Sequence, residues 1–482
     1  MKKELGGYVT LYLALTLGVM LSMMAVLIDG VRRQTVRLET EGVTDLALFS
    51  VFGEYNRQLL EQYDLFFIDT TYGEGSPSLE RVEEHLQFYM NENFQKKGSE
   101  TGFLQDLTAL RCDNTTLTAW EVASDRSGAA IRKQILDYQL GKAGIGWIQS
   151  AAENLNLIYT QGLDGRDVEG EWDQVQGNIK EGLERKRREW EEAGDSYDYS
   201  LDNPADYVSQ TRHSGILYKA LPEGAAVSTI GVDLSKYFSR RRPLTGYGFW
   251  EEDSTRILNI AEKGILWSYL EEKCGSYLKP LEKGLLTYQQ EYLLAGEAKD
   301  DENLQEVLEE ILQLRLAANL AFLMTNSNLQ SQAEAAAVAI CTATMLPELI
   351  QPVKLSILYA WCYAESVQDI RILLDGNRVG LQKTETNWNT PLSQLAFYQS
   401  HLGEYRKSDQ GMDYSDYLAV LFLMRQEETV MERFMDLCEM DIRRTPGNEY
   451  FSIDGCLSAV EVRTNVSSGY GYSYEIIRSY SY

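Results

Sequence analysis

Residues 5–28 read LGGYVTLYLALTLGVMLSMMAVLI, an uninterrupted run without a charged side chain. Lys2 and Lys3 precede this run, and Asp29 and Arg32 follow it. Because an α-helix rises ~1.5 Å per residue, the run is long enough to cross the ~30 Å hydrocarbon layer of a bilayer. We therefore expect a transmembrane anchor, with the lipid bilayer as the partner of Leu5–Ile28.

A cleaved signal peptide is the alternative interpretation of this run. Such a peptide has an apolar core of ~7–15 residues and a site of small residues for cleavage. The run is longer, and Met23, Met24, Val26 and Leu27 offer no such site, which favours a retained anchor. A second apolar stretch, residues 335–364, is broken by prolines and charges into short pieces that suit buried soluble helices.

The composition points to a large acidic body. The chain has 482 residues, 44% hydrophobic content and a formal charge of −27, which predicts two or three packed units that repel nucleic acid. Three His and six Cys are scattered without a CxxC pair, so we expect no metal site and no cofactor. If the body lies outside the cell, one or two disulfide bonds are an alternative that the sequence does not decide. Cys341 and Cys362 lie in apolar stretches typical of buried thiols.

The periodicity predicts strands near both ends of the chain. Apolar residues at helical spacing continue the anchor helix beyond residue 31, with Gly42 as a potential kink. Residues 64–69 predict a short strand, and 107–123 predict two strands around an Asp-Asn turn. Alternating residues in 450–482 predict a β-hairpin, which is marginal alone and should join the other strands in one sheet.

The middle of the chain predicts helices. Residues 164–212 indicate an exposed polar helix followed by an acidic, Tyr-rich loop. The stretch 353–375 is apolar nearly all round, so we expect it at the centre of a bundle. The expected helices of this part are 253–278, capped by Asp253 or Ser254, then 281–296, 301–326, 329–346, 353–375 and 413–440.

These elements define an α+β fold with an N-terminal transmembrane helix that continues into a long helix, a small antiparallel sheet from N- and C-terminal strands, and a central helical bundle. The expected divisions are an anchor, a membrane-proximal α+β region, a polar helix and acidic loop, a helical bundle, and a helix with a hairpin that packs back on the α+β region. Their respective ranges are 1–30, 31–163, 164–250, 251–376 and 377–482.

No nucleotide-binding, metalloprotease or hydrolase motif occurs in the sequence. The best carboxylate candidates for catalysis are Glu365 and Asp369, one turn apart near Trp361. Buried together they would raise each other's pKa, as acid catalysis requires. The alternative is that they mark the polar edge of the helix and pair with Arg371 or with a basic neighbour such as Arg315.

The other charged segments are predicted to be exposed to solvent. The basic cluster Arg185–Arg188 alternates with glutamates and predicts a solvated helix face. Arg240–Arg242 predict a solvated loop, with contact to an acidic partner as the alternative. The acidic loop with Asp195, Asp198, Asp202 and Asp206 is more typical of solvent exposure than of calcium binding.

Two stretches resemble known families. GGYVTLYLALTLGVMLSMMAVLIDG and the following RRQTVRLETEGVTDLAL resemble the opening of TadE/TadG-like pseudopilins, with Asp29 and the Asp45–Ala47 segment in matching places. The stretches QEYLLAGEAKDDENLQEVLEEILQLRLAANLAFL and LYAWCYAESVQDIRILLDGNRVGLQKTETNW resemble an uncharacterised family of single-anchor membrane proteins of Gram-positive anaerobes, related to this pilus-associated group.

The resemblance implies a cytoplasmic N-terminus and an extracytoplasmic body in the cell membrane. The positive residues on the two sides of the run, Lys2 and Lys3 against Arg32, Arg33 and Arg37, nearly balance. Filament-forming pilins are cut after a Gly and carry a Glu five residues later. If the cut follows Gly7, this position is Tyr12, so an accessory component is expected rather than a major subunit.

We therefore expect a single-pass envelope protein, accessory to a Tad/Flp-type pilus or secretion system, with other envelope or pilus-assembly proteins as partners. The alternative is a membrane-anchored extracytoplasmic hydrolase that uses Glu365 or Asp369. A sensing ectodomain is a third option, disfavoured because only four residues precede the run.

Overall fold

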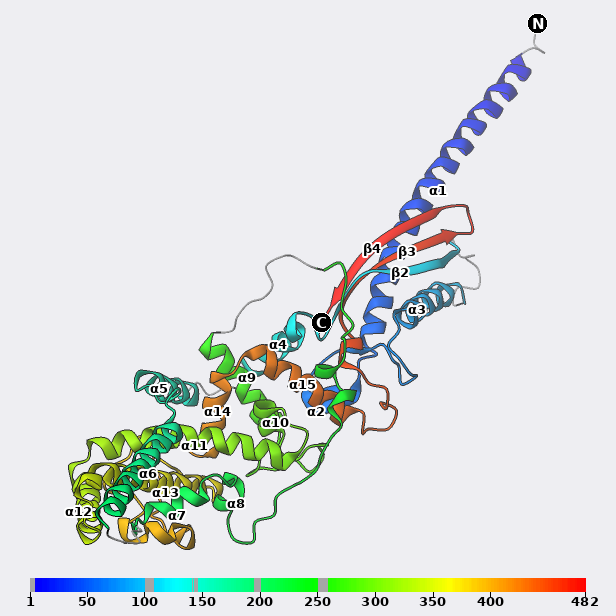
Figure 1. Ribbon diagram of the computed structural model, residues 1–482. Helices are drawn as coiled ribbons and strands as arrows, with labels where there is room; N and C mark the ends of the chain where they lie inside the picture. Colours follow the sequence, from blue (N-terminus) through cyan, green and yellow to red (C-terminus); the bar gives the residue numbers. More distant parts are fainter. Residues whose placement is uncertain (1–4, 100–107, 141, 143–145, 195–200, 250–258) are drawn as a thin grey trace. The chain divides into compact units, whose positions relative to one another are not determined.

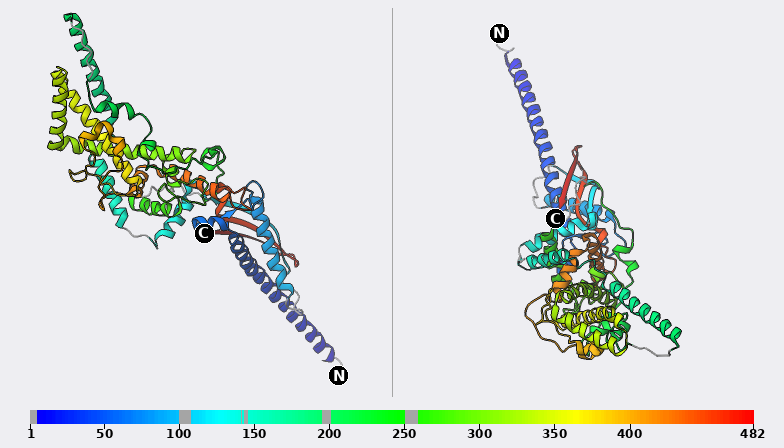
Figure 2. Two further views of the ribbon diagram at one scale, coloured as in Figure 1. Left: turned by 90° about the horizontal axis from the view of Figure 1, so that it is seen from below. Right: turned by 60° about the vertical axis from the view of Figure 1, so that its left-hand side comes forward.

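The computed structural model describes residues 5–99, 108–140, 142, 146–194, 201–249 and 259–482 (Figures 1 and 2). The chain forms two compact units. The anchor unit comprises Met1–Ile135, Lys236–Arg256 and Cys438–Tyr482, and the helical unit comprises Leu136–Ser235 and Ile257–Leu437. The five divisions expected from the sequence are finer than these units and stay a prediction.

Helix α1 (Leu5–Phe52) is one continuous helix that runs through Gly42. Every large apolar side chain from Tyr8 to Ile28 is exposed. Among the described residues, this is the one helix long and apolar enough to cross a membrane. Exposure of so much apolar surface is costly in water and favourable in lipid. The first half of α1 therefore fits a single-pass membrane anchor.

The anchor unit contains an antiparallel sheet with β3 at its centre. Strand β3 (Cys456–Ser468) pairs with β2 (Leu110–Val122) on one edge, and with β1 (Ile68–Asp69) and β4 (Ser473–Ser481) on the other. Strands β3 and β4 form the hairpin expected at the C-terminus. The expected fold class, with strands from both ends of the chain in one sheet, is confirmed.

One sequence expectation about the sheet is wrong. Strand β2 is a single strand and not two strands around a turn at Asp113 and Asn114. A register shift between Cys112 and Asn114 absorbs the extra residue as a bulge. The carboxylate of Asp113 accepts hydrogen bonds from Arg111 and from the hydroxyl of Ser467 on β3, and these bonds hold the segment against the sheet.

The second half of α1 and helix α3 (Leu79–Ser99) pack on one face of the sheet. Val43 and Leu48 of α1 are buried with Val82 of α3 and with Val460 and Val462 of β3. The short helix α2 (Arg57–Tyr63) begins at Asn56, whose side-chain oxygen accepts from two backbone N–H groups. The remaining elements of this unit are the 3-10 turns η2 (Phe238–Arg240) and η5 (Ile453–Gly455).

The helical unit surrounds α13 (Ile350–Leu374), whose residues from Ser356 to Ile370 are all buried. Helices α6, α7, α8, α11 and α12 and the turn η4 contact α13, so the expectation of a central helix is confirmed. The helices and turns of this unit are α5 (Gly146–Thr160), α6 (Val168–Ala193), α7 (Ala205–Thr211), α8 (Ile216–Ala220), α9 (Ile260–Lys273), α10 (Gln289–Ala295), α11 (Asp300–Thr325), α12 (Ser327–Ala343), η3 (Pro347–Leu349), η4 (Leu392–His401) and α14 (Tyr414–Met424). Helices α4 (Asp125–Leu140) and α15 (Glu427–Ile442) and the 3-10 turn η1 (Leu234–Lys236) each contain a unit boundary.

Three expected helices differ in their limits. The expected helix 413–440 is broken into α14 and α15 because Arg425 adopts an extended conformation with ψ 157°. The expected helix 281–296 is reduced to the seven residues of α10. Helix α9 begins at a capping box formed by Asn259 and Glu262, whereas the expected caps Asp253 and Ser254 lie outside the described residues.

All six cysteines lie in the described part of the chain and are buried, and none of them forms a disulfide. The disulfide alternative left open by the sequence does not occur in this structure. Cys341 and Cys362 are fully buried inside the helical unit, as expected for small apolar side chains.

Candidate functional site

A buried ion cluster lies where α11, α13 and the segment after α13 meet. Arg315 of α11 donates through Nε to Oδ2 of Asp369 at 3.0 Å. Nζ of Lys383 donates to Oδ1 of Asp369 at 2.7 Å and also to Glu365. The side chains of all four residues are at most 2% exposed. The cluster thus holds two cations and two carboxylates away from water.

The charges of this cluster satisfy one another. Burial raises the pKa of Asp369, but attraction to Lys383 and Arg315 outweighs it and leaves the pKa below its ordinary value. Burial lowers the pKa of Lys383, but Asp369 and Glu365 raise it above the ordinary value. Both groups are therefore charged at neutral pH. This is opposite to the raised carboxyl pKa that acid catalysis at Asp369 would need.

The carboxylate of Glu365 also positions a loop. It accepts the backbone N–H of Asn389 at 3.0 and 3.1 Å and that of Thr390 at 2.8 Å. Nζ of Lys383 donates to the carbonyl oxygen of Asn387 at 3.2 Å. The cluster therefore holds the backbone of residues 387–390 in place through hydrogen bonds. Glu365 thus has a structural role.

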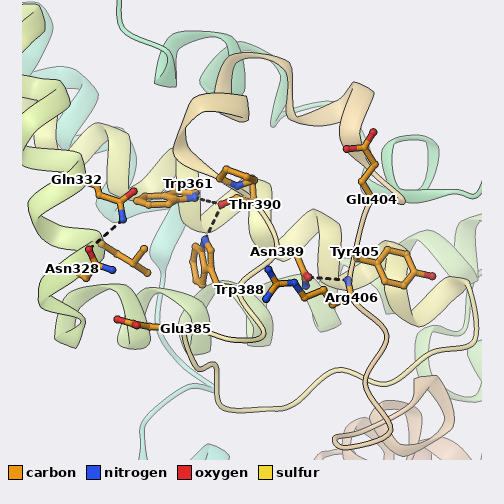
Figure 3. A pocket seen from close by; sticks show the side chains of 12 residues that line it. Asn328, Gln332, Trp361, Glu385, Trp388, Asn389, Thr390, Glu404, Tyr405 and Arg406 are labelled. Atoms are coloured by element: carbon orange, nitrogen blue, oxygen red, sulfur yellow. Dashed lines mark hydrogen bonds between the residues drawn. The ribbon is translucent and has the colours of Figure 1, made fainter.

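This loop forms a wall of a cavity of about 650 Å³ (Figure 3). The opposite wall is the start of α12, and a third wall is the segment after η4. The lining residues are Asn328, Leu329, Gln332, Trp361, Glu385, Trp388, Asn389, Thr390, Pro391, Glu404, Tyr405 and Arg406. Neither Glu365 nor Asp369 is among them, so the two candidate carboxylates do not face this cavity.

Two tryptophans hold the cavity wall in place. The indole N–H groups of Trp361 and Trp388 both donate to the carbonyl oxygen of Thr390, at 2.7 and 3.0 Å. Their rings meet edge to face with centroids 5.8 Å apart. The side-chain oxygen of Asn389 accepts the backbone N–H of Arg406 at 3.2 Å, which ties the third wall to the loop (Figure 3). The cavity is thus built on fixed backbone.

The lining combines aromatic surface with planar polar groups. Gln332 donates to Asn328 across one turn of α12. Glu385 accepts from Asn326, and Arg406 donates to the carbonyl oxygen of Thr386. Two carboxylates and one guanidinium give the lining a slight negative charge. The arrangement suits a small neutral ligand with many hydroxyl or amide groups better than an anion.

A strongly raised carboxyl pKa occurs at Glu291, a residue that the sequence did not indicate. Glu291 of α10 is fully buried, and this burial raises its pKa to about 7. Its Oε1 accepts from the hydroxyl of Tyr414 at 2.8 Å and from the backbone N–H of Tyr277 at 2.8 Å. Its position on a short helix inside a stretch of uncharged residues carries no sequence signal for this environment.

The structure brings Glu365 and Asp369 together and pairs Asp369 with Arg315, but both carboxylates are fully buried and do not mark a polar edge of the helix. Arg371 does not take part and pairs instead with Asp375 at 3.2 Å. Lys383 is the residue that sequence reasoning missed. It lies 14 positions beyond Asp369, outside the helix, so no helical spacing indicates the contact.

The structure also shows the surroundings of the two basic clusters and of part of the acidic loop. Arg241 is not merely solvated, because it is half-buried and pairs with Glu439 and Asp454 within the anchor unit. Lys186 of the first basic cluster pairs with Glu189 at 2.8 Å. Half of the acidic loop lies outside the described residues, and no metal-binding group of His, Cys, Asp or Glu occurs among those described.

These features define a class: a single-anchor α+β protein whose helical unit carries a cavity on a buried ion cluster. The chain belongs to a family of unknown function (DUF5702), whose model matches residues 194–468, more than half of the chain. The matched region contains the ion cluster and the cavity and does not include α1. No curated protein and no solved structure matches the chain.

Proposed function

We propose that this protein is a single-pass envelope protein, with a cytoplasmic N-terminus and an extracytoplasmic body, that serves as an accessory component of a Tad/Flp-type pilus or secretion system. The observation that carries the proposal is α1. One continuous helix is apolar and exposed in its first half and packs on an antiparallel sheet in its second half. This arrangement supports the likeness to pseudopilins that the N-terminal sequence indicates.

An exposed apolar stripe continues along α1 beyond the anchor. Val31, Leu38, Leu46 and Phe49 are 66%, 58%, 46% and 62% exposed, although α1 packs on the sheet through its opposite face. Apolar side chains at this helical spacing offer a surface to a second helix. The stripe supports a role in which α1 packs against the N-terminal helix of another pilus-associated protein.

Fractionation of the producing cells tests the membrane part of the proposal. The protein should remain with membranes after a high-salt wash, because apolar burial in lipid is insensitive to ionic strength. Protease added to intact protoplasts should remove the body. A body that stays protected until the protoplasts are lysed contradicts the proposed topology.

Photo-crosslinking tests the pilus part. Benzoylphenylalanine in place of Phe49 on the stripe should capture a membrane protein with a pseudopilin-like N-terminal helix. Phe88 of α3 is the matched control, because its exposure of 58% is close to the 62% of Phe49. Equal capture from both positions, or capture only of proteins that lack such a helix, contradicts the pilus role.

We propose a second, ligand-binding role on the basis of the cavity. Its volume of about 650 Å³ falls within the ~300–1,000 Å³ of small-molecule sites. The lining presents amides, carboxylates and indole rings to one space, a set that suits the hydroxyl groups and apolar faces of a neutral saccharide. Titration of the full chain in detergent with triacetylchitotriose and maltotriose, followed by calorimetry, tests this role.

The matched variants are Gln332→Ala, inside the cavity, and Gln313→Ala, exposed on α11. Gln332→Ala should weaken saccharide binding about fivefold, the effect of losing one hydrogen bond, and Gln313→Ala should leave it unchanged. If neither saccharide binds, the ligand-binding role is contradicted. The same holds if an oligopeptide binds and the two saccharides do not.

A further inference from the structure

The β3–β4 hairpin lies along α1 and points toward the anchor (Figures 1 and 2). The hydroxyl of Tyr472 bonds to Asp29 near one end, and the hydroxyl of Tyr482 donates to the carbonyl oxygen of Phe52 at 2.6 Å at the other end. From Asp29 to Phe52 the helix rises about 34 Å. From Tyr472 to Tyr482, the residues that flank β4, an extended chain advances about 33 Å, so the two segments have similar total lengths.

Intermediate contacts follow the same order. The hydroxyl of Tyr474 donates to Glu41 at 3.4 Å, and Nε of Arg478 donates to Asp45 at 3.2 Å. The order of contacts along β4 follows the order of residues along α1. The hairpin tip, residues 469–472, is therefore held beside the first turns that follow Ile28.

Tyrosines of the tip and arginines of α1 lie together at the level where the apolar run ends, and Arg33 also pairs with Asp29 at 3.0 Å. The guanidinium of Arg32 lies 4.1 Å from the ring centroid of Tyr470, and that of Arg33 lies 5.3 Å from the ring centroid of Tyr472. Tyr470 remains 40% exposed. Tyrosine rings favour the boundary between hydrocarbon and water, and arginine next to an anchor favours the anionic headgroups of lipids.

We propose that this hairpin tip, together with Arg32 and Arg33, binds the lipid headgroup layer and seats the sheet of the anchor unit on the membrane surface. The inference rests on α1 being a membrane anchor, and it does not depend on a pilus role. The seat fixes the depth of α1 because the hairpin cannot enter hydrocarbon without burying unpaired backbone groups. It also prevents the sheet from tilting freely about the end of the anchor.

A fluorescent label on β4 tests whether the hairpin tip contacts the lipid headgroups. The native cysteines are all buried, so a thiol-reactive environment-sensitive dye selects an added exposed cysteine. Ser473→Cys is next to the tip, and Ser479→Cys is the matched control on the same exposed face of β4, about 20 Å farther along the strand. The full chain is placed in vesicles of phosphatidylcholine and phosphatidylglycerol that carry a nitroxide on the headgroup.

The dye at Ser473→Cys should be quenched at least about twofold more than the dye at Ser479→Cys, because quenching falls steeply over this distance. Tyr470→Ser should reduce the difference, whereas Tyr450→Ser, at an exposed tyrosine away from the tip, should leave it unchanged. Equal quenching at both positions, including absence of quenching at both, overturns the proposal.

Vesicle flotation separates the two possible failures. A chain that does not float with the vesicles contradicts the membrane anchor itself. A chain that floats but shows no selective quenching at Ser473→Cys contradicts the headgroup seat alone. Circular dichroism of each labelled variant confirms that the fold is retained.

Discussion

The first half of α1 and the whole of α13 are both rich in apolar residues, but they meet opposite environments. The large apolar side chains of α1 from Tyr8 to Ile28 are exposed, whereas α13 is buried from Ser356 to Ile370. The difference lies in their charges. The first half of α1 contains none, while α13 buries Glu365 and Asp369 with protein cations beside them. A helix in lipid has no such partners, so only α13 tolerates interior charges.

The largest loss of stability is expected when the cation shared by the two buried carboxylates of α13 is removed. Lys383→Met leaves Glu365 and Asp369 buried with less compensation, and should lower the free energy of unfolding by about 3–5 kcal/mol. Denaturant unfolding of the full chain in detergent measures the change. Lys407→Met, at an exposed lysine, is the control and should change stability by less than about 0.5 kcal/mol. A similarly small loss for Lys383→Met would contradict the account of the cluster.

An added charge in α1 tests the other side of the comparison. Leu17→Arg places a cation near the centre of the apolar run, where insertion into lipid costs about 2.5–3.5 kcal/mol. The fraction of protein that sediments with membranes after a high-salt wash should fall strongly. Leu17→Phe should sediment as the wild type does. Equal sedimentation of the arginine variant would show that α1 is not held by lipid.

Glu291 is a buried carboxyl group that pairs with no cation among the described residues, so it can be compared with Asp369, which pairs with two. The pKa of Glu291 is raised to about 7 by burial, against about 4.3 when unfolded. The native state therefore binds the extra proton between these values, and stability falls as the pH rises through this window. Glu291→Gln should raise stability at pH 8, relative to its effect at pH 4, by up to about 3 kcal/mol.

Denaturant unfolding of both proteins at the two pH values measures this difference, and the comparison between pH values removes any effect of the amide itself. Asp369 should behave in the opposite way. Its pKa is lowered on folding, so its stabilising contribution is present at neutral pH and is lost as the pH falls through the folded-state pKa. An equal effect of Glu291→Gln at pH 4 and pH 8 would contradict the raised pKa.

The smallest effect is expected at the exposed edge of α13. Lys354 pairs with Glu334 at 2.9 Å, and the Glu334 side chain is 52% exposed. Lys354→Ala should lower the free energy of unfolding by only about 0.2–1 kcal/mol, because solvent screens the pair. Measurement in low and high salt checks this prediction, since the loss should shrink as ionic strength rises. A loss as large as that of Lys383→Met would remove the distinction between buried and exposed pairs.

The sequence predicted the elements better than the site. The charge-free run at 5–28 and the alternation in 450–482 depend on local periodicity, and both correspond to observed elements. The buried cluster depends on Arg315, which lies 54 positions before Asp369, and on Lys383 in a loop. No local pattern encodes such contacts, so the sequence indicates Glu365 and Asp369 as candidates but not both of the cations that pair with them.

The chain by itself determined that one helix suits lipid and that another belongs at the centre of a bundle, because length, charge and apolar spacing act within a single element. Only the tertiary structure decided which carboxyl groups pair with buried cations and which ones, Glu291 among them, have a raised pKa. It also decided that the hairpin of residues 456–481 lies beside the exit of the anchor. Such properties arise from residues distant in sequence, whose desolvation and pairing exist only after packing.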